Sequence, residues 1–163
     1  MKTKWILVAE DDSKDASLTL HALTKDKSPA TSEVIITRDG SEALDCLYRR
    51  NDFKSRDGSL PAFILLDLKM PKVDGLEVLR QIKADLRLKM IPVVMFTSSR
   101  EEADLTRCYQ AGTNAYVVKP MDFKEFVTTL KRLSTFWFIV NELPQELKNE
   151  VSVIVVQQPS ARV

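Results

Sequence analysis

Short apolar runs alternate with longer mixed stretches along the chain. The apolar runs have the length and composition of strands that are buried on both faces of a parallel sheet. Most of the mixed stretches place apolar residues on one face of a helix. Because strand and helix alternate five times, the pattern predicts a doubly wound α/β sandwich with an all-parallel sheet. The predicted strands are Trp5–Ala9, Glu33–Thr37, Phe63–Leu66, Ile91–Thr97 and Ala115–Val118.

Capping patterns mark four of the predicted helix starts. In each pattern a residue that can accept an N–H bond precedes a glutamate by three positions, which is the spacing of a capping box. The apolar face of the third helix is expected to run through Ile82 to Leu86, and that of the fifth to include Phe126 and Leu130. The four pairs are Asp39 with Glu42, Asp74 with Glu77, Ser99 with Glu102, and Asp122 with Glu125.

The stretch from Ser13 to about Lys25 permits two interpretations. Apolar residues alternate between positions 16 and 22, as they would in a strand. We favour a helix, because the acids before Ser13 suit a helix N-terminus and because parallel strands need a crossover between them.

Composition and charge narrow the class of protein. With 163 residues, 44% of them hydrophobic and 29% charged, the chain is typical of one globular domain with a short appendage. Lys and Arg (24) balance Asp and Glu (23), so nothing indicates a nucleic-acid or membrane surface. Two distant cysteines without a secretion signal favour reduced thiols in the cytoplasm. A single histidine, His21, argues against zinc chemistry and Ser-His or Cys-His catalysis.

Polar side chains follow four of the predicted strands. They are the acidic run Glu10–Asp12, Asp67, Thr97 and Lys119, and in a parallel sheet they converge on one edge. Clustered carboxylates need a cation, and Mg²⁺ takes carboxylate, water and phosphate oxygens. Lys119 and Thr97 suit phosphate oxygens, and an aspartate can act as a nucleophile toward phosphorus. The set therefore indicates phosphoryl transfer, which depends mainly on positioning and charge neutralisation.

These residues also carry a family resemblance. The acidic pair, "LLDLKMPKVDG" around Asp67, "PVVMFTSS" around Thr97 and "YVVKP" up to Pro120 resemble, in order and spacing, the receiver domain of two-component response regulators. The similarity covers residues 4–133. It implies a flavodoxin-like fold with strand order 2-1-3-4-5. It also implies that Asp67 is the phosphoacceptor for a histidine kinase.

The resemblance assigns roles at the remaining positions. Asp11 is implied as the direct Mg²⁺ ligand, with Glu10 acting through water or a neighbouring contact and Asp12 facing away. Asp67 and the backbone carbonyl of Lys69 are implied to complete the protein ligands. Lys119 is implied to pair with the acyl phosphate.

The same resemblance implies which residues change conformation on phosphorylation and which affect hydrolysis of the phosphoaspartate. The Lys119–Pro120 bond is implied to be cis. Thr97 and Tyr116 are implied to form the conformational switch, the alternative for Tyr116 being an aromatic packed on the fourth helix. Lys69 and Ser99 occupy positions that tune hydrolysis of the phosphoaspartate, in a direction that the sequence does not reveal.

Residues 134–163 are expected to form a C-terminal helix extension and tail without a separate output domain. "STFWFIVNELP" resembles the end of stand-alone receivers that partner phytochrome kinases. Its aromatic residues are Phe136, Trp137 and Phe138. They suit packing on the domain's own core. The alternative is a surface that binds a second copy or the kinase, formed with the fourth helix, fifth strand and fifth helix. Val151–Val156 is strand-like, and its role stays open between sheet addition and disorder.

Three functions are weighed for this arrangement. The favoured one is a phospho-switch that alters protein association and at most slowly dephosphorylates itself. The alternative is a phosphohydrolase that turns over an aspartyl phosphate. Such enzymes usually place a second acid two residues after the nucleophile, where this chain has Lys69. A degenerate docking scaffold is disfavoured because the acids, Thr97 and Lys119 are all present.

Overall fold

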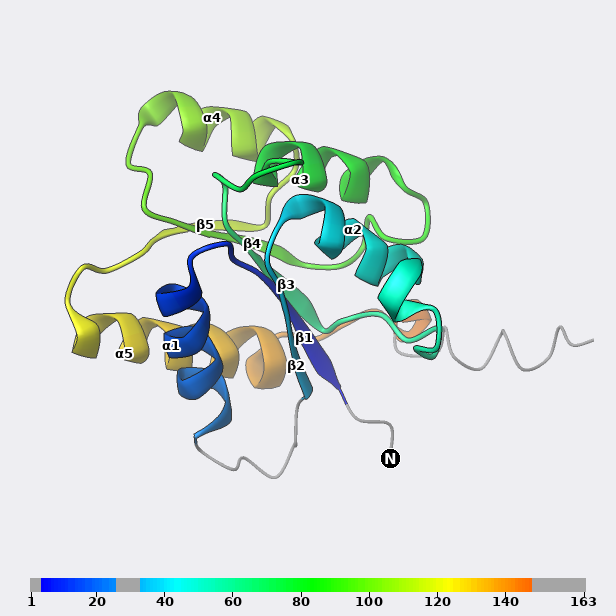
Figure 1. Ribbon diagram of the computed structural model, residues 1–163, viewed down its shortest axis with the longest axis horizontal. Coiled ribbons are helices and arrows are strands. Elements are labelled where there is room, and N and C mark those ends of the chain that lie inside the picture. The colour runs from blue at the N-terminus through cyan, green and yellow to red at the C-terminus, as the bar shows by residue number, and fades with distance from the viewer. Residues whose placement is uncertain (1–3, 26–32, 148–163) are drawn as a thin grey trace, which may run out of the picture.

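A five-stranded parallel sheet in the order β2-β1-β3-β4-β5 forms the centre of the molecule (Figure 1). The structure is a computed structural model that describes residues 4–25 and 33–147. The strands are β1 (Trp5–Ala9), β2 (Glu33–Thr37), β3 (Phe63–Leu66), β4 (Val93–Thr97) and β5 (Ala115–Val118). The helices are α1 (Ser13–Thr24), α2 (Gly40–Tyr48), α3 (Gly75–Ala84), α4 (Glu102–Gln110) and α5 (Phe123–Ser134). The predicted doubly wound fold and its strand order are confirmed.

The helices form a layer on each face of the sheet. Helices α1 and α5 lie side by side on one face, and α2, α3 and α4 cover the other (Figure 1). Strands β1, β3 and β4 are buried along their whole length between these layers. Burial on both faces explains why their sequences are unbroken apolar runs. The stretch that begins at Ser13 is a helix, as favoured. It supplies the crossover that joins β1 to its parallel neighbour β2.

Aspartate caps begin most of the helices. Asp39, Asp74 and Asp122 each accept the backbone N–H three residues on, at 2.8, 2.9 and 3.0 Å. Asp12 does the same for α1 by accepting the N–H of Asp15 at 2.8 Å. These side chains satisfy N–H groups that have no partner inside their helices.

Two predictions about the helices are wrong. Ser99 does not cap α4, which begins at Glu102, because its hydroxyl accepts the N–H of Glu101, the residue before the helix, at 3.4 Å and donates to Asp104 at 2.6 Å. Leu86 lies outside α3 and is 82% exposed. The chain leaves the helix at Asp85, whose carboxylate accepts the N–H of Arg87 and of Leu88. The resulting turn buries Leu88 in place of Leu86.

Helix α5 continues into a π-helical turn, η2 (Thr135–Val140). Its Phe138 is 5% exposed and packs into the core on the α1 and α5 side. Lys4 donates to the Phe138 carbonyl at 3.4 Å and lies 5.2 Å from the ring centroid. Leu147, further along, is also buried in the core. The described part of the extension therefore packs on the domain's own core, and Phe138 is not available for the docking face considered from the sequence.

The other aromatic residues of η2 lie nearer the surface. Phe136 is 47% exposed and meets the half-buried Trp137 edge-on, with 4.9 Å between ring centroids. Val151–Val156 lies outside the described residues. Within residues 4–25 and 33–147, no helix is both long and apolar enough to cross a membrane.

Candidate functional site

Asp67 stands at the carboxyl end of β3, between two neighbouring strands. Its backbone N–H donates to the carbonyl of Ala9 at 3.0 Å, which continues the ladder between β3 and β1. In the turn that follows, the start of α3 is held against the end of β3, because the Gly75 N–H donates to the Leu68 carbonyl at 2.7 Å. A Cβ at Gly75 would lie 2.0 Å from the Asp67 carbonyl oxygen, so only glycine permits this approach. The backbone around Asp67 is thus fixed on both sides.

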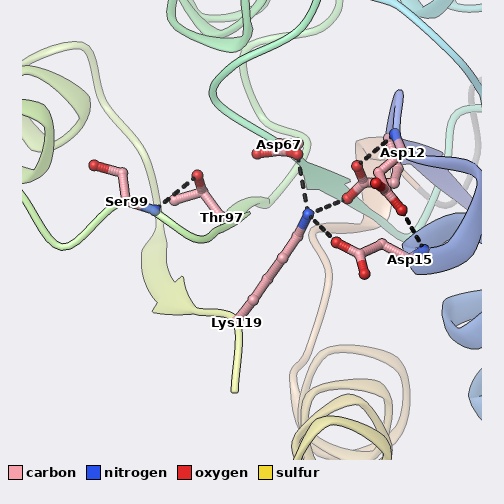
Figure 2. Close-up of polar contacts among 7 residues, drawn as sticks. Asp12, Asp15, Asp67, Thr97, Ser99 and Lys119 are labelled. Carbon is pink, nitrogen blue, oxygen red and sulfur yellow. Dashed lines mark hydrogen bonds and ion pairs between the residues drawn. The ribbon is translucent and has the colours of Figure 1, made fainter. Parts of the chain in front are cut away.

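The amine of Lys119 lies among three carboxylates (Figure 2). Lys119 follows β5, and its Nζ donates to Asp67 Oδ2 and to Asp15 Oδ2, each at 3.0 Å. The third N–H donates to Glu10 Oε2. A lysine ammonium has three donors, so the amine is fully used. Lys119, Glu10 and Asp67 are all buried, which makes these ion pairs stronger than pairs at the surface.

Burial and charge shift the protonation of this group. Burial raises the pKa of Glu10 to about 7, and the nearby Asp67 charge adds to the rise, although Lys119 opposes it. Burial alone would lower the pKa of Lys119, but the hydrogen bond with Glu10 and the Asp67 charge outweigh burial and raise it. Lys119 is therefore a permanent cation at neutral pH, and the carboxylates still carry an excess of negative charge.

Glu10, Asp11 and Asp67 form a set of oxygen donors suited to a hard cation. One carboxylate oxygen of each lies within 4.8 Å of the others. Glu10 and Asp67 are buried while Asp11 is exposed, so the set opens toward solvent. Carboxylate oxygens are the ligands that a hard divalent cation of the Mg²⁺ class takes from protein, with one or two bound directly and water completing its shell. Burial accounts for most of the rise in the pKa of Glu10, repulsion from the nearby Asp67 carboxylate adds to it, and a bound cation would relieve that repulsion.

The Ser99 backbone and side chain connect three elements beside Asp67. Its N–H donates to the hydroxyl of Thr97, the last residue of β4, at 3.3 Å (Figure 2). Its hydroxyl donates to Asp104 of α4 at 2.6 Å. Its carbonyl accepts the Tyr116 hydroxyl of β5 at 3.0 Å. Burial raises the pKa of Tyr116, so its hydroxyl remains a donor at neutral pH.

These side chains surround one open pocket of about 520 Å³. The structure brings together Glu10, Asp11, Asp67, Thr97 and Lys119 on its wall, as the strand ends predicted. The wall also includes Lys69, Ser99 and Asp12, whose carboxylate caps α1 and lies outside the set of Glu10, Asp11 and Asp67. Tyr116 lies behind this wall, where its ring packs on the core that also contains Cys108 of α4.

The expected cis bond between Lys119 and Pro120 is wrong, because the bond is trans. Trans is the lower-energy form of a bond before proline by about 0.5–1 kcal/mol. The trans backbone already lets the Lys119 N–H bond the Thr97 carbonyl at 2.8 Å while the amine reaches all three carboxylates. Nothing in the local geometry therefore calls for the cis form.

Asp15 and Asp104 are site residues that the sequence did not single out. Asp15 lies in the first turn of α1, four residues after Asp11, and Asp104 lies in the first turn of α4. Asp12 precedes Asp15 by three residues and caps α1 by accepting the Asp15 N–H, so Asp15 lies in the first turn of the helix, beside the acidic run. The contact of Asp104 with Ser99 depends on where α4 begins, and that point was wrongly predicted.

Comparison with known proteins identifies the family of the chain. The family model described as the response regulator receiver domain matches residues 6–131. The chain belongs to this family. The receiver is 36% identical to response regulator Rcp1 of Synechocystis over 141 residues, which span 86% of the chain and 93% of Rcp1. It is 40% identical over 139 residues to the probable methanogenesis regulatory protein FilR2 of Methanothrix harundinacea, spanning 85% and 86% of the two chains.

Solved structures agree with the sequence relatives. The phosphorylated cyanobacterial phytochrome response regulator RcpA matches with a TM-score of 0.82 and 36% identity, covering 88% of the receiver and 99% of RcpA. The Mn²⁺-bound form of Rcp1 matches with a TM-score of 0.79 and 35% identity, covering 86% and 99%. The receiver is thus a phosphoacceptor of two-component signalling whose partner is a histidine kinase. Receivers bind a divalent metal ion, and the carboxylates here fit one.

Proposed function

We propose that Asp67 is the phosphoacceptor of this receiver and that Mg²⁺ assists the transfer. The observation that carries the proposal is the position of the Asp67 carboxylate. It lies 3.0 Å from the Lys119 amine, within 4.8 Å of the other two acids, on the wall of an open pocket. A nucleophile in that position meets a cation on one side and a metal site on the other.

In the proposed transfer, an Asp67 carboxylate oxygen attacks the phosphorus of a kinase phosphohistidine. The new O–P bond forms as the P–N bond breaks, and the electron pair stays on the imidazole nitrogen, which takes up a proton. Bound Mg²⁺ would neutralise charge on the phosphoryl oxygens. Asp11, Asp67, Glu10 (directly or through water) and the Lys69 carbonyl would hold the ion. Lys119 would exchange a carboxylate for a phosphoryl oxygen.

We further propose that Thr97 and Tyr116 transmit the change. Thr97 ends β4 on the wall of the pocket that holds Asp67, and its hydroxyl bonds the Ser99 N–H. A phosphoryl oxygen on Asp67 would attract the Thr97 hydroxyl and release that N–H. Because Tyr116 and α4 are both bonded to Ser99, the β4–α4 segment would rearrange as one unit. Lys69 and Ser99, which lie on the wall of the same pocket, are proposed to set how fast water removes the phosphoryl group.

A phytochrome is the proposed type of kinase partner, since RcpA is described as a phytochrome response regulator. The proposed output is a change in association, including a homodimer through α4, β5, α5 and the exposed part of η2 around Phe136. We place the receiver domain at residues 4–133, with 134–163 as its extension and tail. The free, buried thiols of Cys46 and Cys108 suit the reducing cytoplasm.

The test combines the receiver with Mg²⁺ and a small acyl phosphate donor, followed by intact-mass measurement. We expect one added phosphoryl group on the wild type and on an Asp52→Asn control, in which an exposed acid is replaced. We expect none on Asp67→Asn, and none on the wild type after chelation of the metal. Phosphorylation of Asp67→Asn would contradict the assignment. Release of phosphate over many turnovers would favour the phosphohydrolase alternative.

A further inference from the structure

Asp15 makes the one contact of the Lys119 amine that lies outside the cation-binding set. Of the three carboxylates bonded to this amine, Glu10 and Asp67 also belong to the group whose oxygens lie within 4.8 Å of one another. Asp15 does not belong to that group, although its Oδ2 is 3.0 Å from Nζ. The lysine and a divalent cation therefore compete for two carboxylates, and only the third is free for the lysine alone.

Binding of a divalent cation at these carboxylates destabilises the contacts of the Lys119 amine. A divalent ion at Glu10 and Asp67 withdraws carboxylate charge from the Lys119 amine and also repels it. The amine is buried and has three donors, so it needs another acceptor that stays in place. The Asp15 carboxylate meets that need without leaving the pocket wall.

The position of Asp15 suits this role. It lies in the first turn of α1, which Asp12 fixes by accepting the Asp15 N–H at 2.8 Å. Its side chain is 28% exposed, compared with 4% for Glu10 and 10% for Asp67. Figure 2 shows it on the side of the amine away from Asp67 and Thr97. A lysine drawn toward Asp15 moves away from the position of the cation.

We propose that Asp15 is a positioning residue for Lys119. Its carboxylate holds the amine on the α1 side of the pocket and so leaves Glu10 and Asp67 available to a divalent cation. This inference rests on the proposed metal site. It adds that the affinity of the site depends on an acid that does not itself contact the metal.

The test measures the Kd of MgCl₂ by titration calorimetry on the whole, unphosphorylated protein. We expect Asp15→Asn to raise the Kd about fivefold or more, because the amine then keeps its hold on the metal ligands. We expect Asp15→Glu to recover most of the affinity, since it restores the charge and can reach the amine. Circular dichroism of each variant checks that α1 and the fold are retained.

A matched control separates positioning from simple loss of charge. Asp12→Ser removes one negative charge from the same pocket wall and the same helix end, and serine can still cap α1. We expect it to raise the Kd clearly less than Asp15→Asn. Equal shifts in the two variants, or no rescue by Asp15→Glu, would overturn the role of Asp15 while the metal site stands. Failure of the wild type to bind Mg²⁺ would overturn the proposed site and this inference together.

Discussion

At the scale of single residues, the site gathers several carboxylates around one buried lysine, Lys119. The buried Lys119 amine contacts three acids, Glu10, Asp15 and Asp67, and the Asp11 carboxylate lies close to two of these acids, Glu10 and Asp67. Burial raises the pKa of Glu10 to about 7, and the nearby Asp67 charge adds to the rise. A group whose pKa rises on folding destabilises the folded state in its charged form. The metal-free receiver should therefore be more stable when Glu10 is neutral.

Replacing Glu10 by Gln should change how the free energy of unfolding depends on pH. Unfolded Glu10 loses its proton near its ordinary pKa of 4.5, while folded Glu10 keeps it up to about pH 7. Wild-type stability should fall as pH rises through this window, and Glu10→Gln should not show that fall. In urea denaturation without divalent ions, we expect the variant to gain about 1–2 kcal/mol over wild type near pH 8 and little near pH 5. A difference that does not vary with pH would contradict this origin.

The sequence located most of these residues, for a physical reason. Runs such as Phe63–Leu66 fix the strand ends, and parallel strands must bring those ends to one edge. Asp15 was missed because its role depends on the helix period of α1 and on the reach of Lys119. The trans bond at Lys119–Pro120 could not be predicted either, since the same two residues permit both isomers and the surrounding loop decides between them.

At the scale of elements, the β4–α4 connection depends on Ser99. Its N–H, hydroxyl and carbonyl bond Thr97, Asp104 and Tyr116 respectively, which belong to β4, α4 and β5. No side chain caps helix α4. The hydrogen bond between Ser99 and Asp104 therefore links the first turn of α4 to the site. The start of α4 was wrongly predicted because a serine three residues before a glutamate fits a capping box equally well.

Ser99→Ala should weaken the link between phosphorylation and α4. Hydrogen exchange of α4 amides, measured before and after phosphorylation, is expected to change clearly in the wild type and less in the variant. The variant should also exchange faster in the first turn of α4 before phosphorylation, because Asp104 loses its donor. Ser98→Ala, which alters the exposed neighbouring hydroxyl on the same pocket wall, should behave as the wild type. An unchanged α4 response in Ser99→Ala would remove this residue from the switch.

The turn between β3 and α3 gives a second prediction at this scale. In Gly75→Ala the new Cβ would lie 2.0 Å from the Asp67 carbonyl oxygen and 2.8 Å from the Leu68 Cα, both backbone atoms that cannot rotate away. The turn must shift, so we expect a loss of about 2 kcal/mol or more of unfolding free energy and slower phosphorylation of Asp67. Denaturation and intact-mass kinetics check the two effects, and wild-type values for both would show that the turn is less constrained than its geometry indicates.

At the scale of the whole molecule, the described part of the C-terminal extension, up to residue 147, contributes to the receiver's core. Phe138 and Leu147 are buried, although the match to the family model ends at residue 131. The sequence left open whether this aromatic stretch faces inward or outward. A π-helical turn rotates successive side chains differently from an α-helix, so the period of the pattern could not decide which aromatic residue is buried.

The two faces of η2 can be separated by matched substitutions. Phe138→Ala should lower the free energy of unfolding by about 3–4 kcal/mol, because it empties a packed site in the core. Phe136→Ala removes the same ring from a half-exposed position and should cost less than about 1 kcal/mol. Size-exclusion chromatography then tests the proposed dimer, which Phe136→Ala should weaken. A large loss of stability in Phe136→Ala would place that ring in the core instead.

The positions of the two tryptophans have a consequence for spectroscopy. Trp5 begins β1, and Trp137 lies in η2 beside the Phe138 carbonyl that Lys4 contacts, so both indoles sit where the strands enter the sheet. Asp67 lies where the strands leave it. An ion or phosphoryl group bound at Asp67 is too far from either fluorophore to quench it by direct contact. A change in intrinsic emission during signalling would therefore report motion relayed through the full thickness of the protein, which makes native fluorescence a label-free readout of long-range response.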